Sequence, residues 1–191
     1  MDAGLSVFLE CGYERATIDQ IVALAGGSKS AVYDIFGGKD DLLFAILRRT
    51  AEDISSSGSQ QLPDKVEQLR PFLVGIARSI VQSVLREDII GLYCLAVEAS
   101  RRNPKIGKLY YAAGPLKAQG DFGTLLASFD KRGLLRIPDT ELASRFFFGM
   151  LLDKAHLAMS LGQMKPPTTR QCSRLAEGAV DVFLTAFRAI T

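Results

Sequence analysis

The sequence lacks the long apolar segment of a membrane protein and the leader of a secreted one. No apolar run reaches the roughly 18 residues that a membrane span needs. The nearest candidate, residues 146–162, is interrupted by Asp153, Lys154 and His156. The N-terminus has no basic segment followed by an apolar core, so no signal peptide is expected. We therefore expect a cytoplasmic protein that has no membrane partner.

Residues for catalysis and metal binding are also scarce. The chain has one histidine and three cysteines, and the wide spacing of Cys11, Cys94 and Cys172 matches no metal site. The motifs G-x-S-x-G, H-E-x-x-H and G-x-x-x-x-G-K-[ST] do not occur, because the glycine-rich segment 26–30 lacks the spacing of a phosphate-binding loop. We expect no catalytic residue, no metal, no cofactor and no enzyme activity.

What is present is the composition and periodicity of a globular helical protein. Of the 191 residues, 48% are hydrophobic and 23% are charged, and apolar residues recur at helical spacing with no clear alternation of a strand. The sequence predicts an all-α fold of about nine helices. They begin with a helix over residues 2–11 that Gly12-Tyr13 closes.

The segment from Thr17 to Leu43 carries the most specific pattern. Thr17 and Gln20 have the spacing of a capping box, and Gly26-Gly27 suits the end of a helix. Ser28 can cap the next helix. Its inward face is predicted to contain Val32, Ile35 and Phe36. Gly37-Gly38 then separates it from a longer helix over residues 39–56. Two short helices around a glycine turn predict a helix-turn-helix.

These residues resemble a known family. The N-terminal DNA-binding domain of TetR-type transcriptional regulators is similar to the run Phe8, Gly12-Tyr13, Thr17, Ile21, Ala25-Gly26, Ser28-Lys29, Val32-Tyr33, Phe36, Lys39 and Leu42. Residues 90–187 resemble one of that family's C-terminal domains, the AefR type. The resemblance implies a helix-turn-helix DNA-binding domain over residues 1–48 and a helical ligand-binding and dimerisation domain over residues 49–191. The implied function is a homodimeric repressor that a small molecule releases from a double-stranded DNA operator.

The resemblance gives each polar residue of the motif an expected role. Thr17 and Ser28 would offer hydroxyls to phosphates beside the N–H groups of helix N-termini. Tyr33 would place its hydroxyl on a phosphate while its ring packs inward, and Lys39 would supply charge at the start of the next helix. Lys29 and Ser30 would reach base edges in the major groove.

The charge of this region is unfavourable for DNA. Residues 1–50 contain five basic and seven acidic side chains, a net charge of −2, whereas phosphate binding requires a basic surface. We expect the native protein to have a longer first helix preceded by a basic arm. The alternative is a helical interaction or scaffold module that has lost DNA binding.

The second half of the chain is expected to be helical throughout. Helices are predicted from Pro63 onward with a kink or restart at Pro71, over 88–102, over 105–132 with a break at Gly114-Pro115, and over 141–161 and 168–190. The serine-rich run 55–59 marks a boundary, either as part of a connecting helix or as a flexible linker.

The last two predicted helices have more apolar surface than one face can hold. The second partner is then another copy of the same pair, in a four-helix interface, or the interior of a single monomer. For the first interpretation we predict an interface of Met150, Leu157, Leu175, Ala179, Val182, Phe183 and Ala186.

A small, largely apolar ligand is expected among the aromatic side chains of the second domain, although cavity walls and core residues look alike in sequence. His156 follows Asp153 by three residues, and such a pair could lie at a pocket, at the dimer interface or at a satisfied polar position of a bundle. The candidate ligand-binding residues are Phe72, Tyr93, Tyr110, Phe122, Phe147 and His156.

Overall fold

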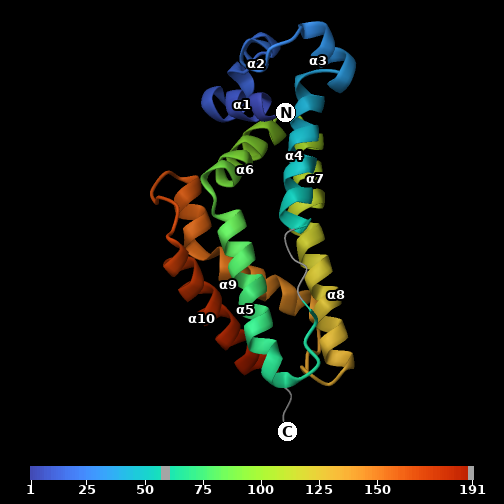
Figure 1. Cartoon of the computed structure of the whole chain (residues 1–191), viewed down its shortest axis with the longest axis vertical. Helices are drawn as coiled ribbons and strands as arrows, with labels where there is room; N and C mark the ends of the chain where they lie inside the picture. Colours follow the sequence, from blue (N-terminus) through green and yellow to red (C-terminus); the bar gives the residue numbers. More distant parts are fainter. Residues whose placement is uncertain (57–60, 189–191) are drawn as a thin grey trace. The chain divides into compact units, whose positions relative to one another are not determined.

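The computed structural model describes residues 1–56 and 61–188. Within these ranges the chain forms ten α-helices, one five-residue π-helix and a single isolated bridge between Leu135 and Arg188 (Figure 1). The all-α prediction is confirmed. No helix in the described ranges is long and apolar enough to cross a membrane.

Contacts divide the helices into two compact units. The N-terminal unit contains residues 1–54 and 91–115, and the C-terminal unit contains residues 55–90 and 116–191. The first of these is larger than the predicted DNA-binding domain of residues 1–48. That domain boundary stays a prediction.

The N-terminal unit has one apolar core. It is built by α1 (Asp2–Arg15), α2 (Ile18–Ala25), α3 (Lys29–Phe36), α4 (Lys39–Ser56), the part of α6 (Glu87–Ser100) from Gly91 onward, and α7 (Pro104–Tyr111). Phe8 from α1 and Leu43 from α4 are fully buried at its centre. The later helices add Leu92, Leu95, Ala99 and Ile106 to the same cluster.

The first helix continues past its predicted end. Gly12 interrupts it with φ 78° and ψ 163°, a conformation that is accessible essentially to glycine alone. The helix then runs on to Arg15. This break turns the side chain of Tyr13 into the core.

The C-terminal unit consists mainly of α5 (Val66–Val84), α8 (Lys117–Lys131), α9 (Thr140–Ser160) and α10 (Thr169–Phe187). α5 packs along α10, and α8 packs against α9, which also contacts α5 and α10. Phenylalanine rings fill the space between these helices: Phe122 stacks on Phe147 at 4.5 Å between centroids, and Phe147 meets Phe183 edge to face at 5.2 Å.

Several predicted boundaries are confirmed and others are wrong. The break at Gly114-Pro115 is the π-helix η1 (Ala112–Leu116) between α7 and α8. Pro63, by contrast, lies before its helix, which begins at Val66 and contains Pro71. α10 ends at Phe187, and the predicted end at 190 lies outside the described residues. Of the serine-rich run, α4 includes residues 55 and 56, and the rest is also outside the described ranges.

Candidate nucleic-acid interface

Two side-chain caps fix the geometry of the predicted helix-turn-helix. At the start of α2, the Gln20 N–H donates to Thr17 Oγ1 at 3.3 Å, and the Thr17 N–H donates to Gln20 Oε1 at 2.8 Å. At the start of α3, the Ala31 N–H donates to Ser28 Oγ at 3.2 Å. Both predicted caps are confirmed. They leave Thr17 and Ser28 exposed at helix N-termini, where free N–H groups favour an anion.

α3 presents most of its surface to solvent. Only Val32 and Phe36 are partly buried, and they lie four positions apart on one side. The prediction that Ile35 also faces inward is wrong, since its side chain is 70% exposed. Ile35 lies about 100° around the helix from Phe36, and an eight-residue helix packed along one narrow line cannot cover both. Tyr33 is also 53% exposed, so its ring packs inward only in part.

The two predicted base-reading residues have intramolecular partners. Lys29 Nζ forms an ion pair with Asp19 Oδ1 of α2 at 2.5 Å. Ser30 Oγ donates a hydrogen bond to Asp34 Oδ2 at 3.2 Å, one turn further along α3. Both pairs are exposed. Exposed ion pairs contribute little, about 0–1 kcal/mol, so Lys29 can exchange Asp19 for another anion at small cost.

Lys39 has a role that its sequence position does not reveal. Its ammonium group has three protons, and Nζ lies 2.9, 3.3 and 3.2 Å from the carbonyl oxygens of Tyr13, Glu14 and Ala16. Nζ is also 4.5 Å from the centre of the Tyr13 ring. The cation therefore neutralises the C-terminal end of α1. The predicted phosphate contact by Lys39 stays a prediction, and it would require Nζ to exchange at least one of these carbonyl acceptors for a phosphate oxygen.

A cluster of polar side chains joins α1 and α4 to the start of α7. Asp40 accepts hydrogen bonds from the Tyr13 hydroxyl and, at 2.6 Å, from Asn103 Nδ2. Glu14 and Arg102 add an ion pair of 2.9 Å between the same parts of the chain. Burial, together with the hydrogen bond to Asp40, raises the pKa of the Tyr13 hydroxyl. Tyr13 thus stays a neutral donor at physiological pH.

The six candidate ligand-binding residues do not gather at one cavity. Tyr93 and Tyr110 lie in the N-terminal unit with their rings 6.0 Å apart. The other four lie in the C-terminal unit, where Phe72 packs against Phe129 and where Phe122 and Phe147 are buried against each other. His156 is partly buried, and burial lowers its pKa.

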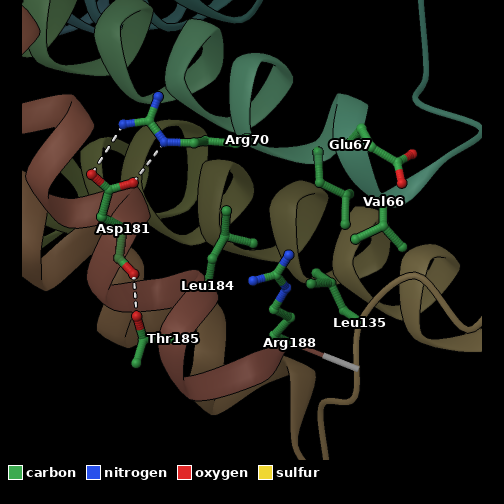
Figure 2. Close-up of a pocket in the computed structure, with 9 residues that line it drawn as sticks. Val66, Glu67, Arg70, Leu135, Asp181, Leu184, Thr185 and Arg188 are labelled. Carbon is green, nitrogen blue, oxygen red and sulfur yellow. Dashed lines mark hydrogen bonds and ion pairs between the residues drawn. The ribbon is translucent and has the colours of Figure 1, made fainter. Parts of the chain in front are cut away.

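A pocket of about 390 Å³ lies instead between the start of α5 and the end of α10 (Figure 2). Its apolar wall consists of Val66, Leu69, Leu135 and Leu184. On one side Arg70 donates two hydrogen bonds to Asp181, at 2.7 and 3.0 Å. The side chain of Arg188 lies between Leu184 and Leu135, and none of the candidate ligand-binding residues lines this pocket. Sequence reasoning missed it because Arg70 and Asp181 are 111 positions apart.

The residues of the predicted dimer interface fall into three groups by exposure. Leu157 and Val182 are about 60% exposed, at 62% and 60%, and Ala186 is also exposed, while Met150 and Leu175 are partly buried. Ala179 and Phe183, at 6% and 1%, face the core of the C-terminal unit and are withdrawn from the surface. Exposed apolar residues of α9 that were not predicted are Leu142 and Phe146.

No group of three histidine, cysteine or acidic residues that could hold a metal occurs among the described residues.

Family comparisons agree with the helix-turn-helix geometry. Residues 1–46 match the family model described as bacterial regulatory proteins of the tetR family. Residues 71–189, more than half of the chain, match the C-terminal domain of AefR-like transcriptional repressors. The chain belongs to the TetR family.

Individual proteins share part of this sequence or its fold. The HTH-type transcriptional regulator HbdR of Aromatoleum sp. (strain CIB) is 29% identical over 101 residues, which cover 53% of this chain and 38% of HbdR. A crystal structure of a TetR-family regulator from Mesorhizobium loti superimposes with a TM-score of 0.85 at 22% identity, covering 98% of this chain and 94% of that one. The flavonoid-responsive regulator FrrA gives a TM-score of 0.78 at 22% identity, covering 100% and 95%.

As a TetR-family member, the protein is a DNA-binding transcriptional regulator and not an enzyme. α2 and α3 are the helices of its helix-turn-helix. Members of this family bind operators and small-molecule effectors and are typically dimeric.

Proposed function

We propose that this protein is a dimeric repressor that binds an operator through α3. A small, largely apolar molecule releases the repressor from the operator. The observation that carries the proposal is the surface of α3. A helix that buries only Val32 and Phe36, and that begins at a serine cap, leaves nearly all its side chains available to a major groove. Such a repressor would act in the cytoplasm, where the chromosome is accessible.

Within this proposal, Thr17, Ser28 and Tyr33 contact phosphates, and Lys29 and Ser30 approach base edges. Lys29 would release Asp19 on binding. Selection of bound fragments from random or genomic DNA tests the proposal directly, because a regulator enriches one motif. Loss of a phosphate contact in Tyr33→Phe should weaken binding to all sequences alike and leave the salt slope unchanged, because the slope counts only phosphates that cations neutralise.

The dimer would form through the outer faces of α9 and α10. Leu157, Val182 and Ala186 are exposed, and together with Phe146 they would leave apolar surface on the monomer. A second copy of the same helix pair could cover it in a four-helix interface. Sedimentation of the whole chain as a monomer at micromolar concentration would contradict this assembly.

The effector would occupy the pocket between α5 and α10. Its volume of about 390 Å³ lies within the range of small-molecule sites, roughly 300–1,000 Å³. Four aliphatic side chains would hold an apolar body, and the guanidinium of Arg188 would donate hydrogen bonds to one oxygen-bearing group of the ligand. A ligand among the candidate residues Phe122 and Phe147 would instead require their stacked rings to separate.

Release from DNA follows if the effector prefers a state of the dimer in which the two DNA-binding domains no longer match the spacing of the two half-sites. Half-sites lie about one helical turn apart, so a small rotation of each domain spoils simultaneous contact. Coupling is reciprocal: an effector that weakens DNA binding tenfold, about 1.4 kcal/mol, must itself bind tenfold more weakly to the DNA complex. Thermal-shift screening followed by titration with and without operator tests this. Equal affinity in both titrations would exclude a regulatory site.

The acidic composition of residues 1–50 favours a second candidate function. A module with a net charge of −2 in its first 50 residues could use the same helical surfaces to bind protein partners alone. The DNA selection separates the two functions, because this module would enrich no motif at low salt.

A further inference from the structure

The outermost line of α3 carries an acidic residue that has no cation beside it. Val32 and Phe36 mark the buried side of the helix. Asp34 is two residues from each, about 160° to 200° around the helix, and therefore lies opposite that side. No ion pair of Asp34 occurs within the described part of the chain.

The position of Asp34 does not serve the stability of α3. It is the third residue from the end of a helix that ends at Phe36, and a negative charge near a helix C-terminus is unfavourable. A carboxylate facing the phosphates of DNA would add repulsion. If α3 enters the groove, this side chain needs a donor from a base.

Ser30 shares the same face and has already used its proton. It lies one turn before Asp34, and its hydroxyl donates to Asp34 Oδ2 at 3.2 Å. Both residues are exposed. While this hydrogen bond is kept, the Ser30 hydroxyl and the second oxygen of Asp34 can only accept. Lys29, the nearest cation on α3, instead reaches Asp19. The centre of the α3 surface is therefore a pair of acceptors.

Few groups in the major groove can donate to such a pair. Guanine offers O6 and N7, thymine offers O4 and adenine offers N7, all of which are acceptors. The donors are the exocyclic amino groups, cytosine N4 and adenine N6. Carboxylates are the side chains that typically accept from cytosine N4.

We propose that Ser30 and Asp34 form an acceptor pair that determines operator specificity by reading the amino group of cytosine. This inference rests on the proposed function, since it assigns the reading chemistry of the same helix. It also gives the carboxylate of Asp34 a role, because this group rejects guanine and thymine at one position of each half-site.

The test begins with selection from random DNA by the whole chain and by the variants Ser30→Ala, Asp34→Ala and Asp34→Asn. Glu52→Gln is the control for charge, because Glu52 is exposed on α4 about 20 Å along that helix from its first residue. We expect the wild type and Glu52→Gln to enrich the same motif with one required cytosine. Asp34→Ala should lose that requirement, and Asp34→Asn should shift it toward adenine, which asparagine recognises.

A base analogue makes the test specific for the amino group. In the selected operator, the required cytosine is replaced by 2-pyrimidinone, which has hydrogen in place of the N4 amino group. Wild-type affinity should fall about tenfold or more, whereas the affinity of Asp34→Ala should be the same for both duplexes.

Two outcomes overturn the inference in different ways. If all variants enrich the wild-type motif, or if the analogue weakens the wild type and Asp34→Ala equally, the acceptor pair does not read a base and the proposed function stands. If the wild type enriches no motif at all, the proposed function and the inference fall together.

Discussion

Replacing Lys39 by alanine should destabilise the protein, although the family motif places this lysine at DNA. The substitution removes three charge-assisted hydrogen bonds to the carbonyl oxygens at the end of α1 and the contact with the Tyr13 ring. A cation at a partly buried helix C-terminus contributes up to about 2 kcal/mol, and a cation–π contact contributes about 0.5–1 kcal/mol. These contributions overlap, and water can reach part of the site. We therefore expect a loss of about 2 kcal/mol.

For a chain of this length, a loss of that size lowers the melting temperature by about 4–8 °C. Thermal and urea unfolding followed by circular dichroism measure it. Lys29→Ala is the matched control, because it removes the same group from an exposed ion pair and should cost under about 1 kcal/mol.

A role of Lys39 in binding a DNA phosphate predicts the opposite result. If Lys39 were held by phosphate, Lys39→Ala would leave the unfolding curve unchanged and would lower the salt slope of operator binding by about 0.9. Unchanged unfolding together with a lower slope would refute the assignment of Lys39 to the end of α1.

Two further predictions concern the C-terminal unit. Val182→Glu should leave the fold intact and yield monomers in sedimentation, because Val182 is exposed. Phe183→Glu should instead unfold the unit, because a charge would enter the core. A Val182→Glu variant that sediments as a dimer would contradict the proposed interface. Burial holds the pKa of His156 below its ordinary value, so the neutral form is favoured by folding. The associated stability is present above about pH 6.5 and is lost as pH falls through the lowered pKa. His156→Gln should therefore lose less stability between pH 7.5 and 5.5 than the wild type in urea unfolding, and equal losses would contradict this.

The parts of the structure that sequence predicts correctly depend on neighbours in the chain. The caps by Thr17 and Ser28 need a donor three residues away, and the break at Gly114-Pro115 needs only the local backbone. Such features follow from residue type and spacing. The caps, helices and turn of the helix-turn-helix were therefore predictable from the sequence.

The errors concern which side of a helix faces inward and which distant groups meet. Ile35 is apolar, yet α3 packs along a single line and leaves it in solvent. Phe183 and Val182 are adjacent on a helix rich in apolar residues, where periodicity alone cannot tell core from interface. Lys39 meets the end of α1 across 23 to 26 positions, and the α5–α10 pocket depends on residues 111 positions apart.

Contacts between distant parts of the chain also determine which residues the helix-turn-helix needs in order to fold. Leu92, Leu95 and Ile106 are buried in the core of α1 and α4, and Asn103 and Arg102 bind Asp40 and Glu14. Burial of each large aliphatic side chain is worth about 1.5–3 kcal/mol. The three together contribute on the order of 5–9 kcal/mol, comparable with the 5–15 kcal/mol that a whole domain has in reserve. A fragment of residues 1–56 lacks this cover and should show no cooperative unfolding transition by circular dichroism, while the whole chain should show one. A cooperative transition in the fragment would mean that α1–α4 fold without residues 91–115.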